Sequence, residues 1–503
     1  MSSEGWDDVP PQSAEAVVTA TPGRVWSEEQ IKIGEWAKGS KGNAKVVARA
    51  GCGKTSSIAG VVIPNAPEAK ILYVVFNKKN QLEAKDKISD PRVDVKTFNG
   101  LGFGFVRGQW RNCRPDDLVE RDRIRLIEPK IPNSVIGEVL KLVGWAKNCS
   151  AEAKAAELEM VAEEKGWEAE EWESREWGIK RLAEIAKAAM DLAKEPEALG
   201  RISFNDQLWL PIVMGWVRPW WDLVIVDEAQ DTNPTQKKMI EGCFRKGGRI
   251  LFVGDNRQAI YGFRGADGDS LGQLGRRFSA ETLTLTTTYR CAKAIVREAN
   301  VEVPDLKARD GAPEGMVNEL TKRALIGVVG AGDAILSRTN APLMPICLAL
   351  LKAGKRAKIE GREIGKQLLA IAEKWKARTV PEFLTGVTAW KQRKVARVLA
   401  KNLDPDIAAG QLEGIEDQAS IFFAVAEDAE GVAEINQRLL TLFGEAAGDA
   451  GGIVLSSVHR AKGLEWKRVF LLGETFRREK GGEEANIWYV ATTRAQQSLT
   501  WVW

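Results

Sequence analysis

Residues 46–55 read Val-Val-Ala-Arg-Ala-Gly-Cys-Gly-Lys-Thr, a short apolar run that enters a loop of small residues and ends in Gly-Lys-Thr. Small residues allow successive backbone N–H groups to turn inward around the oxygen atoms of a phosphate. The stretch therefore predicts a phosphate-binding loop between a strand and a helix, in which Lys54 reaches the β- and γ-phosphates and the Thr55 hydroxyl binds Mg²⁺. The first position of the general G-x-x-x-x-G-K-S/T pattern is Ala48 here. An ordinary glycine-containing turn is the alternative, which the sequence downstream disfavours.

Length and composition narrow the class of protein. A chain of 503 residues is long enough for three or four domains, and a charged fraction of 28% is typical of a globular protein. The formal net charge is only +3, so a nucleic-acid-binding surface must be a local basic face. The six cysteines form no C-x-x-C pair and His459 is the only histidine, which argues against a zinc site, a disulfide framework and a Ser-His-Asp triad. The most apolar stretch, 208–226, contains proline and charged residues and predicts core structure rather than a membrane span.

A second informative stretch, 221–231, reads Trp-Asp-Leu-Val-Ile-Val-Asp-Glu-Ala-Gln-Asp. Its apolar residues predict a buried strand with two carboxylates at the carboxyl end. Asp227 is suited to hold Mg²⁺ through water, and Glu228 to orient and deprotonate an attacking water molecule. A surface acidic turn is the alternative, which the buried strand directly before it disfavours.

Three further apolar runs end in polar or aromatic residues. Residues 71–76 lead into Asn77-Lys78-Lys79, and 93–97 lead into Phe98-Asn99-Gly100. Such groups lie where α/β sheets bind ligands, although ordinary loop chemistry explains them equally well. The run 250–253 leads into 254–266, where Gln258 can sense a γ-phosphate and Tyr261 and Phe263 can stack on bases or belong to the core.

Taken in order, these motifs resemble those of superfamily 1 DNA helicases of the UvrD/Rep type, from Gln30 to about Leu499. The family's A-x-A-G-x-G-K-T loop matches residues 48–55 and accounts for Ala48. Its D-E-A-Q-D box and its G-D-x-x-Q-x-I-Y-x-W/F-R-G-A motif match 227–231 and 254–266. Residues 76–79 and 97–101 resemble the family's two single-strand-contacting motifs, and the Phe-Asn-Lys form of the first favours the F-box DNA helicase or phage branch.

The second half of the chain carries three more resemblances. Thr288-Tyr289-Arg290 is similar to the family's N-Y-R motif, with Arg290 directed at the γ-phosphate. Residues 453–466 are similar to its T-x-H-x-x-K-G-L-E-W motif, in which His459 and Lys462 would face DNA and Glu465 the ribose or the domain junction. Residues 489–495 are similar to its V-A-x-T-R-A motif, which places Arg494 as an arginine finger.

The resemblance implies three sets of site residues. The catalytic set is Lys54, Asp227, Glu228, Gln258, Arg290 and Arg494. The nucleotide-binding set is Gln30, Ala50, Gly51, Cys52, Gly53, Lys54, Thr55, Ser56, Arg290, Glu465 and Arg494, with Mg²⁺ bound by Thr55 and Asp227. The DNA-binding set is Phe76, Asn77, Lys78, Thr97, Phe98, Asn99, Tyr261, Phe263, Arg264, His459 and Lys462.

The implied fold is α/β, with two RecA-like parallel-sheet domains that each carry a mainly helical insertion. We expect a disordered leader over 1–24 and no nuclease domain after the last motif. The expected domain ranges are 25–106 with 200–280 for the first, ATP-binding domain, 107–199 for its helical insertion, 281–360 with 451–503 for the second domain, and 361–450 for a reduced helical insertion.

The implied function is an ATP-dependent DNA helicase that uses ATP and Mg²⁺, translocates on single-stranded DNA and unwinds duplexes, with 3′-to-5′ polarity from the resemblance alone. A translocase that strips proteins from DNA with little unwinding is the first alternative. An ATP-gated DNA scaffold without turnover is the second, which the intact catalytic set disfavours. The implied partners are single-stranded DNA, duplex junctions and a single-strand-binding, replication or recombination protein, and no membrane. The expected location is the cytoplasm of a bacterial or phage-infected cell, or a eukaryotic nucleus, and the pathway (replication, repair or recombination) stays open.

Overall fold

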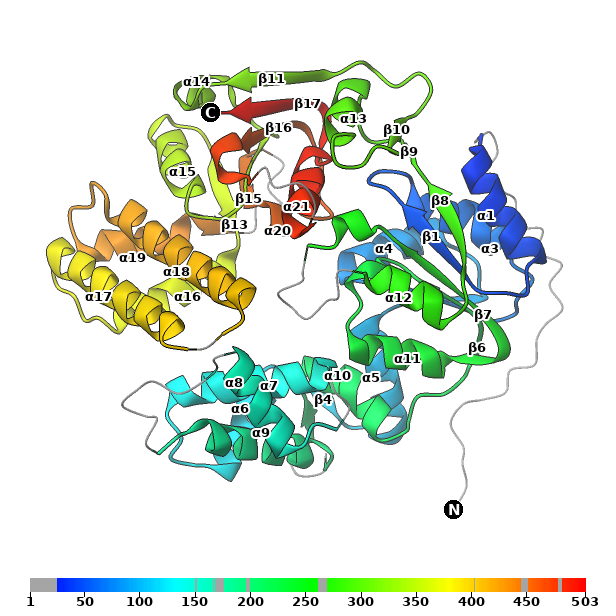
Figure 1. The fold of residues 1–503 in the computed structure, drawn as a ribbon, viewed down its shortest axis with the longest axis horizontal. Coiled ribbons are helices and arrows are strands. Elements are labelled where there is room, and N and C mark those ends of the chain that lie inside the picture. The colour runs from blue at the N-terminus through cyan, green and yellow to red at the C-terminus, as the bar shows by residue number, and fades with distance from the viewer. Residues whose placement is uncertain are drawn as a thin grey trace.

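The computed structural model describes residues 25–149, 152–165, 167, 176–195, 200–260, 269–401, 403–444, 451–477 and 482–503. Each half of the chain builds one parallel β-sheet flanked by helices, and each half also carries a layer of helices set apart from its sheet (Figure 1). The predicted leader, 1–24, and the predicted DNA contacts Tyr261, Phe263 and Arg264 lie outside the described residues.

The first sheet has six parallel strands in the order β3-β2-β6-β7-β1-β8. Every residue of β2 is buried, because helices cover both faces of the sheet. Strand β8 pairs with β1 from Ala44↔Glu281 to Ala48↔Leu285. Residues 281–285, expected in the second domain, therefore belong to the first sheet. The strand bounds are β1 (Ala44–Ala48), β2 (Ile71–Val75), β3 (Val93–Thr97), β6 (Trp221–Val226), β7 (Phe244–Gly254) and β8 (Glu281–Leu285).

The helices around this sheet begin where the sequence places polar caps. Ser27 caps α1 (Glu28–Gly39) in a capping box with Gln30. The helix after the phosphate loop begins as α2 (Lys54–Ser57), widens into one π-helical turn (Ile58–Val62) and ends as α3 (Ile63–Asn65). The other helices are α4 (Lys78–Lys87), α5 (Phe98–Gln109), α11 (Pro234–Cys243) and α12 (Ser270–Arg277), with short turns η3 (Ala229–Asp231) and η4 (Asn256–Gln258).

The first insertion is helical, as expected, and has a hydrophobic core of its own. Trp177 is buried in that core and Trp167 packs against it. Helix α10 packs against both α5 and α11 and so joins the insertion to the first sheet. The bounds are α6 (Val119–Ile127), α7 (Asn133–Cys149), α8 (Ala155–Lys165), α9 (Ile179–Ala193) and α10 (Phe204–Val213), with β4 (Arg114–Pro115) paired to β5 (Arg201–Ile202).

A buried ionic network fixes this junction. Asp206 on α10 accepts hydrogen bonds from Arg123 Nη1 (2.5 Å) on α6 and from Lys147 Nζ (2.6 Å) on α7. Lys147 also donates to Glu120 Oε1 at 3.0 Å. Burial opposes ionisation of Asp206, but the charges of Lys147 and Arg123 outweigh it and lower its pKa to about 2. One carboxylate therefore holds three helices in a fixed arrangement.

Replacing Asp206 with asparagine is expected to destabilise the protein by about 3–5 kcal/mol, because two buried cations lose their shared carboxylate. The ordinary aspartate pKa is 3.8, so this stabilisation is complete above about pH 4 and is lost as the pH falls toward 2. Urea unfolding followed by tryptophan fluorescence at pH 7 and pH 3 measures both effects. Asp191→Asn is the control, because Asp191 is an exposed partner of Lys187 on α9; equal stability losses in the two variants would contradict the prediction.

The second sheet has seven parallel strands in the order β11-β17-β16-β12-β15-β13-β14. The strand bounds are β11 (Met316–Leu320), β12 (Ala334–Ser337), β13 (Ala357–Glu360), β14 (Phe443–Gly444), β15 (Ile453–Ser457), β16 (Trp466–Leu472) and β17 (Ala495–Val502). The helices around it are α13 (Lys293–Ala299), α14 (Lys322–Val328), α15 (Leu343–Lys352), α20 (Val458–Ala461) and α21 (Gly482–Thr492). A short parallel pair, β9 (Thr287–Thr288) and β10 (Lys307–Ala308), lies between the two sheets in the chain's path.

The second insertion differs from the first because it shares one continuous hydrophobic core with its sheet. Phe383, Phe422 and Trp390 of the insertion belong to the same buried cluster as Ile335 and Phe470 of the sheet. Gln411 Nε2 donates to Lys165 O at 2.9 Å and so joins the two insertions, which face each other in Figure 1. The helices are α16 (Arg362–Glu373), α17 (Val380–Leu399), α18 (Pro405–Ala426) and α19 (Val432–Thr441). None of the helices described in either half is long and apolar enough to cross a membrane.

Candidate functional site

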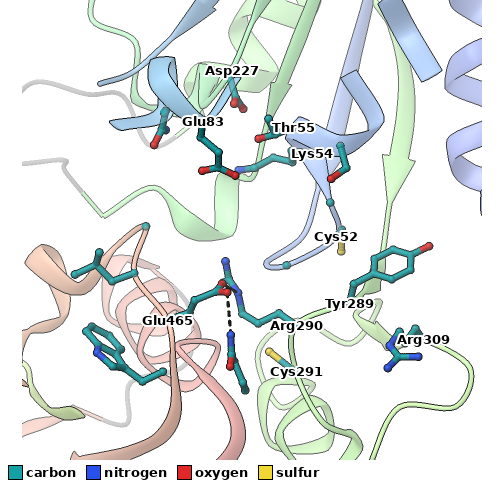
Figure 2. A pocket seen from close by; sticks show the side chains of 18 of the residues that line it. Cys52, Lys54, Thr55, Glu83, Asp227, Tyr289, Arg290, Cys291, Arg309 and Glu465 are labelled. Atoms are coloured by element: carbon teal, nitrogen blue, oxygen red, sulfur yellow. Dashed lines mark hydrogen bonds and ion pairs between the residues drawn. The ribbon is translucent and has the colours of Figure 1, made fainter. Parts of the chain in front are cut away.

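A cavity of about 830 Å³ lies between the two halves of the chain, at the carboxyl ends of β1 and β6 (Figure 2). Its wall combines the phosphate-loop residues with groups from the second half, so neither half forms the site alone. The first half contributes Gly51, Cys52, Gly53, Lys54, Thr55, Ser56, Asp227 and Glu228; the second contributes Tyr289, Arg290, Arg309, Glu465, Trp466 and Gln496.

The phosphate loop requires glycine at two positions. Gly51 and Gly53 have φ angles of +71° and +74°, in the left-handed region that glycine tolerates best. A Cβ atom at Gly51 would lie 2.5 Å from Arg290 Cβ, so a side chain there would push the two halves apart. Helix α2 begins at Lys54, which directs its N-terminal N–H groups at the cavity.

Lys54 and Glu228 form the central ion pair, with Nζ 2.6 Å from Oε1. Burial would lower the pKa of Lys54, but the charges of Glu228 and Asp227 outweigh it and raise that pKa. Burial likewise opposes ionisation of Glu228, but the Lys54 and Lys462 charges lower its pKa to about 2. Glu228 has a left-handed φ of 50°, which is strained for a residue with a side chain and is typical of functional sites.

Asp227 is buried beside Glu228 and suits a divalent cation. Burial and the Glu228 charge raise its pKa to about 6. Tyr73 donates its hydroxyl to Asp227 Oδ2 at 2.9 Å, and the Glu228 N–H donates to Oδ1 at 2.9 Å. The Asp227 carboxylate, the adjacent half-buried Glu228 carboxylate and the Thr55 hydroxyl all line the same cavity. This donor set fits Mg²⁺, which prefers oxygen ligands.

The two predicted arginines occupy different environments. Arg290 lines the cavity, forms an ion pair with Glu465 and donates from Nη1 to Thr493 O at 3.3 Å. Arg494 is only 1% exposed, so it does not line the cavity. It donates to backbone carbonyl groups of Val490 and Leu464, at 3.0 and 3.1 Å. Burial and the charge of Arg290 lower the pKa of Arg494 to about 9. Its predicted role as an arginine finger therefore stays a prediction that requires movement.

The sequence analysis expected Lys462 to face DNA. In the structure, Lys462 lies between the two halves of the chain and contacts residues of the first half. Its Nζ atom donates to Asp231 Oδ2 and to the Gln258 carbonyl oxygen, both at 2.6 Å. Asp231 is a buried carboxylate, and the lysine supplies the cation that burial demands. The Gln258 amide donates to Asp255 Oδ2 at 2.9 Å. His459, on α20, is half-buried.

Gln30 is buried beneath the cavity rather than in its wall. Its Nε2 atom donates to Ser57 Oγ at 2.8 Å, and its Oε1 atom accepts from the Ser27 N–H at 3.0 Å. Tyr289, which the sequence analysis quoted only as part of a motif, lines the cavity and is 39% exposed. Its hydroxyl lies 3.3 Å from Gln30 Oε1. The position of Tyr289 directly before Arg290 in the sequence could have identified it as a cavity residue.

The predicted DNA-contacting motifs follow β2 and β3, which are neighbours in the first sheet. Phe76 is 38% exposed and Lys78 donates to Gln81, whereas Asn77 and Thr97 cap α4 and α5. The expectation that Phe98 contacts DNA needs correction. Phe98 is only 2% exposed, because its side chain packs in the hydrophobic core beneath the sheet.

One residue in this region escaped the sequence analysis. Asn99 Nδ2 donates to Phe204 O at 2.8 Å, and the Phe204 ring is 54% exposed at the start of α10. No local sequence pattern predicts that an aromatic side chain after a long insertion will be exposed beside a distant motif. The fold alone brings it beside Asn99.

A glycine-rich loop, adjacent carboxylates and a facing arginine around one cavity define the class of two-domain nucleoside-triphosphate-binding proteins. Residues 27–279 match the UvrD/REP helicase N-terminal domain, and residues 424–503 match the UvrD-like helicase C-terminal domain. The chain belongs to the UvrD/REP helicase family, which confirms the resemblance inferred from the motifs.

Several curated proteins are similar to this chain. F-box DNA helicase protein 1 of Schizosaccharomyces pombe is 26% identical, over 90% of this chain and 55% of its own length. DNA helicase II of Escherichia coli is 26% identical, over 64% of this chain and 50% of its own length. ATP-dependent DNA helicase PcrA of Staphylococcus aureus is 25% identical, over 56% of this chain and 40% of its own length. The chain thus spans about half the length of the curated relatives it matches.

Proposed function

We propose that this protein hydrolyses ATP to translocate along single-stranded DNA and to unwind duplex DNA. The observation that carries the proposal is the cavity in which Lys54, Asp227 and Glu228 of one half face Arg290 of the other. Lys54 and the phosphate-loop N–H groups would hold the triphosphate, and Thr55 and Asp227 would hold Mg²⁺, which neutralises phosphate charge.

The Lys54–Glu228 ion pair suggests how nucleotide binding prepares the base. Without nucleotide, Lys54 holds the pKa of Glu228 low, so the carboxylate is a poor proton acceptor. A γ-phosphate competes for the Lys54 ammonium, which releases Glu228 and raises its pKa. Glu228 can then orient the attacking water and accept its proton.

Closure of the cavity would couple hydrolysis to movement. Arg290 belongs to the second half, so its attraction to the γ-phosphate favours a closed arrangement that hydrolysis reverses. Phe76 and Phe204 offer exposed aromatic rings near the predicted DNA motifs, where base stacking is tolerant of sequence. The 3′-to-5′ polarity is proposed on the family resemblance alone.

A translocase with little unwinding is the second candidate, because the second insertion is packed into its own domain. The Asp417 carboxylate on α18 accepts a hydrogen bond from the Ala341 N–H at 2.7 Å, and the insertion shares the core of the second sheet. A subdomain held in this way has limited freedom to move against a duplex.

Three assays separate these functions. Stimulation of ATPase activity by single-stranded DNA supports either motor and excludes a scaffold without turnover. Forked duplexes with a 3′ or a 5′ tail then test unwinding and its polarity, and displacement of streptavidin from biotinylated DNA tests translocation alone. Absence of DNA-stimulated ATPase activity would contradict the proposal.

Replacing Arg290 with alanine is expected to lower kcat for ATP hydrolysis roughly 100-fold, with a smaller effect on ATP affinity, because its charge acts mainly on the transition state. Arg297→Ala is the control, since Arg297 is an exposed residue of α13 that forms an ion pair with Glu314. Steady-state kinetics and thermal melting measure both variants. A loss of affinity at unchanged kcat would assign Arg290 to ground-state binding instead.

A further inference from the structure

Arg49 is the second residue of the phosphate loop, at the position that the family's A-x-A-G-x-G-K-T pattern leaves open. Its side chain is only 15% exposed, yet Arg49 is not among the described residues that line the cavity. A long cation on this loop that does not reach the cavity has no direct part in the proposed chemistry. Its two carboxylate partners, one in each half of the chain, indicate a different role.

One edge of the Arg49 guanidinium is anchored in the first half. Its Nη1 atom donates to Asp255 Oδ1 at 2.8 Å, and the Asp255 side chain is fully buried. Asp255 directly follows β7, the strand that pairs with β1 in the first sheet. Among the ion pairs of the described residues, Arg49 is the only cation that pairs with Asp255. A buried carboxylate requires such a cation, so this contact holds the Arg49 side chain in one position.

The other edge of the guanidinium binds the second half. Its Nε and Nη2 atoms donate to the two carboxylate oxygens of Asp305, at 3.0 and 2.9 Å. Asp305 lies between α13 and β10, and its side chain is 47% exposed. Two parallel hydrogen bonds fix the plane of the guanidinium as well as its distance from the carboxylate. A neighbouring contact joins the same two segments, because Arg257 donates from Nη2 to the Glu302 carbonyl oxygen.

Asp305 precedes the short strand pair that leads to Arg290. Strand β10 begins two residues after Asp305 and pairs with β9, which ends two residues before Arg290. The Arg49 backbone lies close to the same strands, since its N–H donates to Leu285 O at 2.9 Å, at the end of β8. The clearance is small, because a Cβ atom at Gly51 would lie 2.5 Å from Arg290 Cβ. A small shift of the strand pair would therefore change the position of Arg290 over the phosphate loop.

We propose that Arg49 is a positioning residue that ties the phosphate loop to Asp305 and so sets the position of Arg290 relative to the bound phosphates. This inference rests on the proposed ATPase function and adds to it a residue that does not touch the nucleotide. The two contacts of Arg49 have separable effects. The contact with Asp255 stabilises the fold, and the contact with Asp305 aligns the two halves. Loss of the second contact alone should slow hydrolysis, with little effect on ATP affinity or on stability.

Single-turnover ATP hydrolysis, ATP binding and thermal melting of the full chain separate the two contacts. Arg49→Gln is expected to lower the melting temperature, because it leaves Asp255 without a cation. It should also lower the hydrolysis rate about 10-fold, with ATP affinity within about threefold. Asp305→Ala should lower the rate about 3- to 10-fold at an unchanged melting temperature, because Asp305 is exposed.

Two further variants serve as controls. Arg49→Lys keeps a cation for Asp255 but lacks the planar pair of donors, so it should restore the melting temperature and not the rate. Arg277→Gln breaks an ion pair with Glu241 inside the first half and should leave the rate unchanged.

Arg290→Ala shows whether Arg49 acts through Arg290. In that background, Arg49→Gln and Asp305→Ala should each lower the rate by less than about twofold, because the group that they position is absent. Equal losses in both backgrounds would overturn the proposal. An unchanged rate in Asp305→Ala, or full recovery of the rate in Arg49→Lys, would also overturn it while leaving the ATPase function intact. Absence of ATP hydrolysis by the unaltered chain would refute the proposed function, and this inference with it.

Discussion

Lys54→Ala is expected to lower the rate of ATP hydrolysis by roughly 100- to 1,000-fold and to weaken ATP binding. Lys54 is the lysine at the start of the helix after the loop, where we propose that it binds the phosphates, and its ammonium lies 2.6 Å from Glu228. Its loss should remove charge stabilisation from the transferring phosphoryl group, and it leaves Glu228 without its ion-pair partner. Steady-state ATPase assays with and without single-stranded DNA measure the effect.

The variant should still bind single-stranded DNA in the absence of nucleotide, because the predicted DNA motifs lie at the ends of β2 and β3. Lys38→Ala is a matched control, since Lys38 is an exposed lysine on α1. An ATPase rate near that of the unaltered protein would reject the assignment of the active site.

Glu228→Gln should lower the hydrolysis rate by roughly 100- to 10,000-fold while ATP binding is retained. The amide keeps the shape of the side chain and can still accept a hydrogen bond from Lys54, but it cannot accept the proton of the attacking water. ATP should therefore stay bound and unhydrolysed, which filter binding with labelled ATP and a single-turnover assay detect.

Glu281→Gln, at the exposed start of β8, serves as the control for this substitution. Thermal melting must accompany both variants, because Glu228 adopts a strained backbone conformation. Unimpaired turnover in a folded Glu228→Gln variant would remove Glu228 from the role of general base and leave it as a partner of Lys54.

The sequence by itself determined the fold class, the family and the phosphate-loop end of the site. These features depend on short contiguous patterns: small residues before Lys54, an apolar strand before Asp227, and a serine that caps α1. Each pattern sets a local backbone geometry, and a parallel sheet then brings the strand ends to one edge. The order of the motifs along the chain was enough to infer two sheets.

Tertiary structure decided which of the named side chains reach the cavity. Lys462 binds Asp231 of the other half, and Arg494 is buried and donates to the Leu464 carbonyl oxygen. Phe98 packs in an apolar cluster with side chains from distant strands. Arg309 and Phe204 gain their positions from strand pairing and from a helix that follows a long insertion. Burial, charge neutralisation and register act between distant segments, so the motif positions define the candidates and the packing of the two halves selects among them.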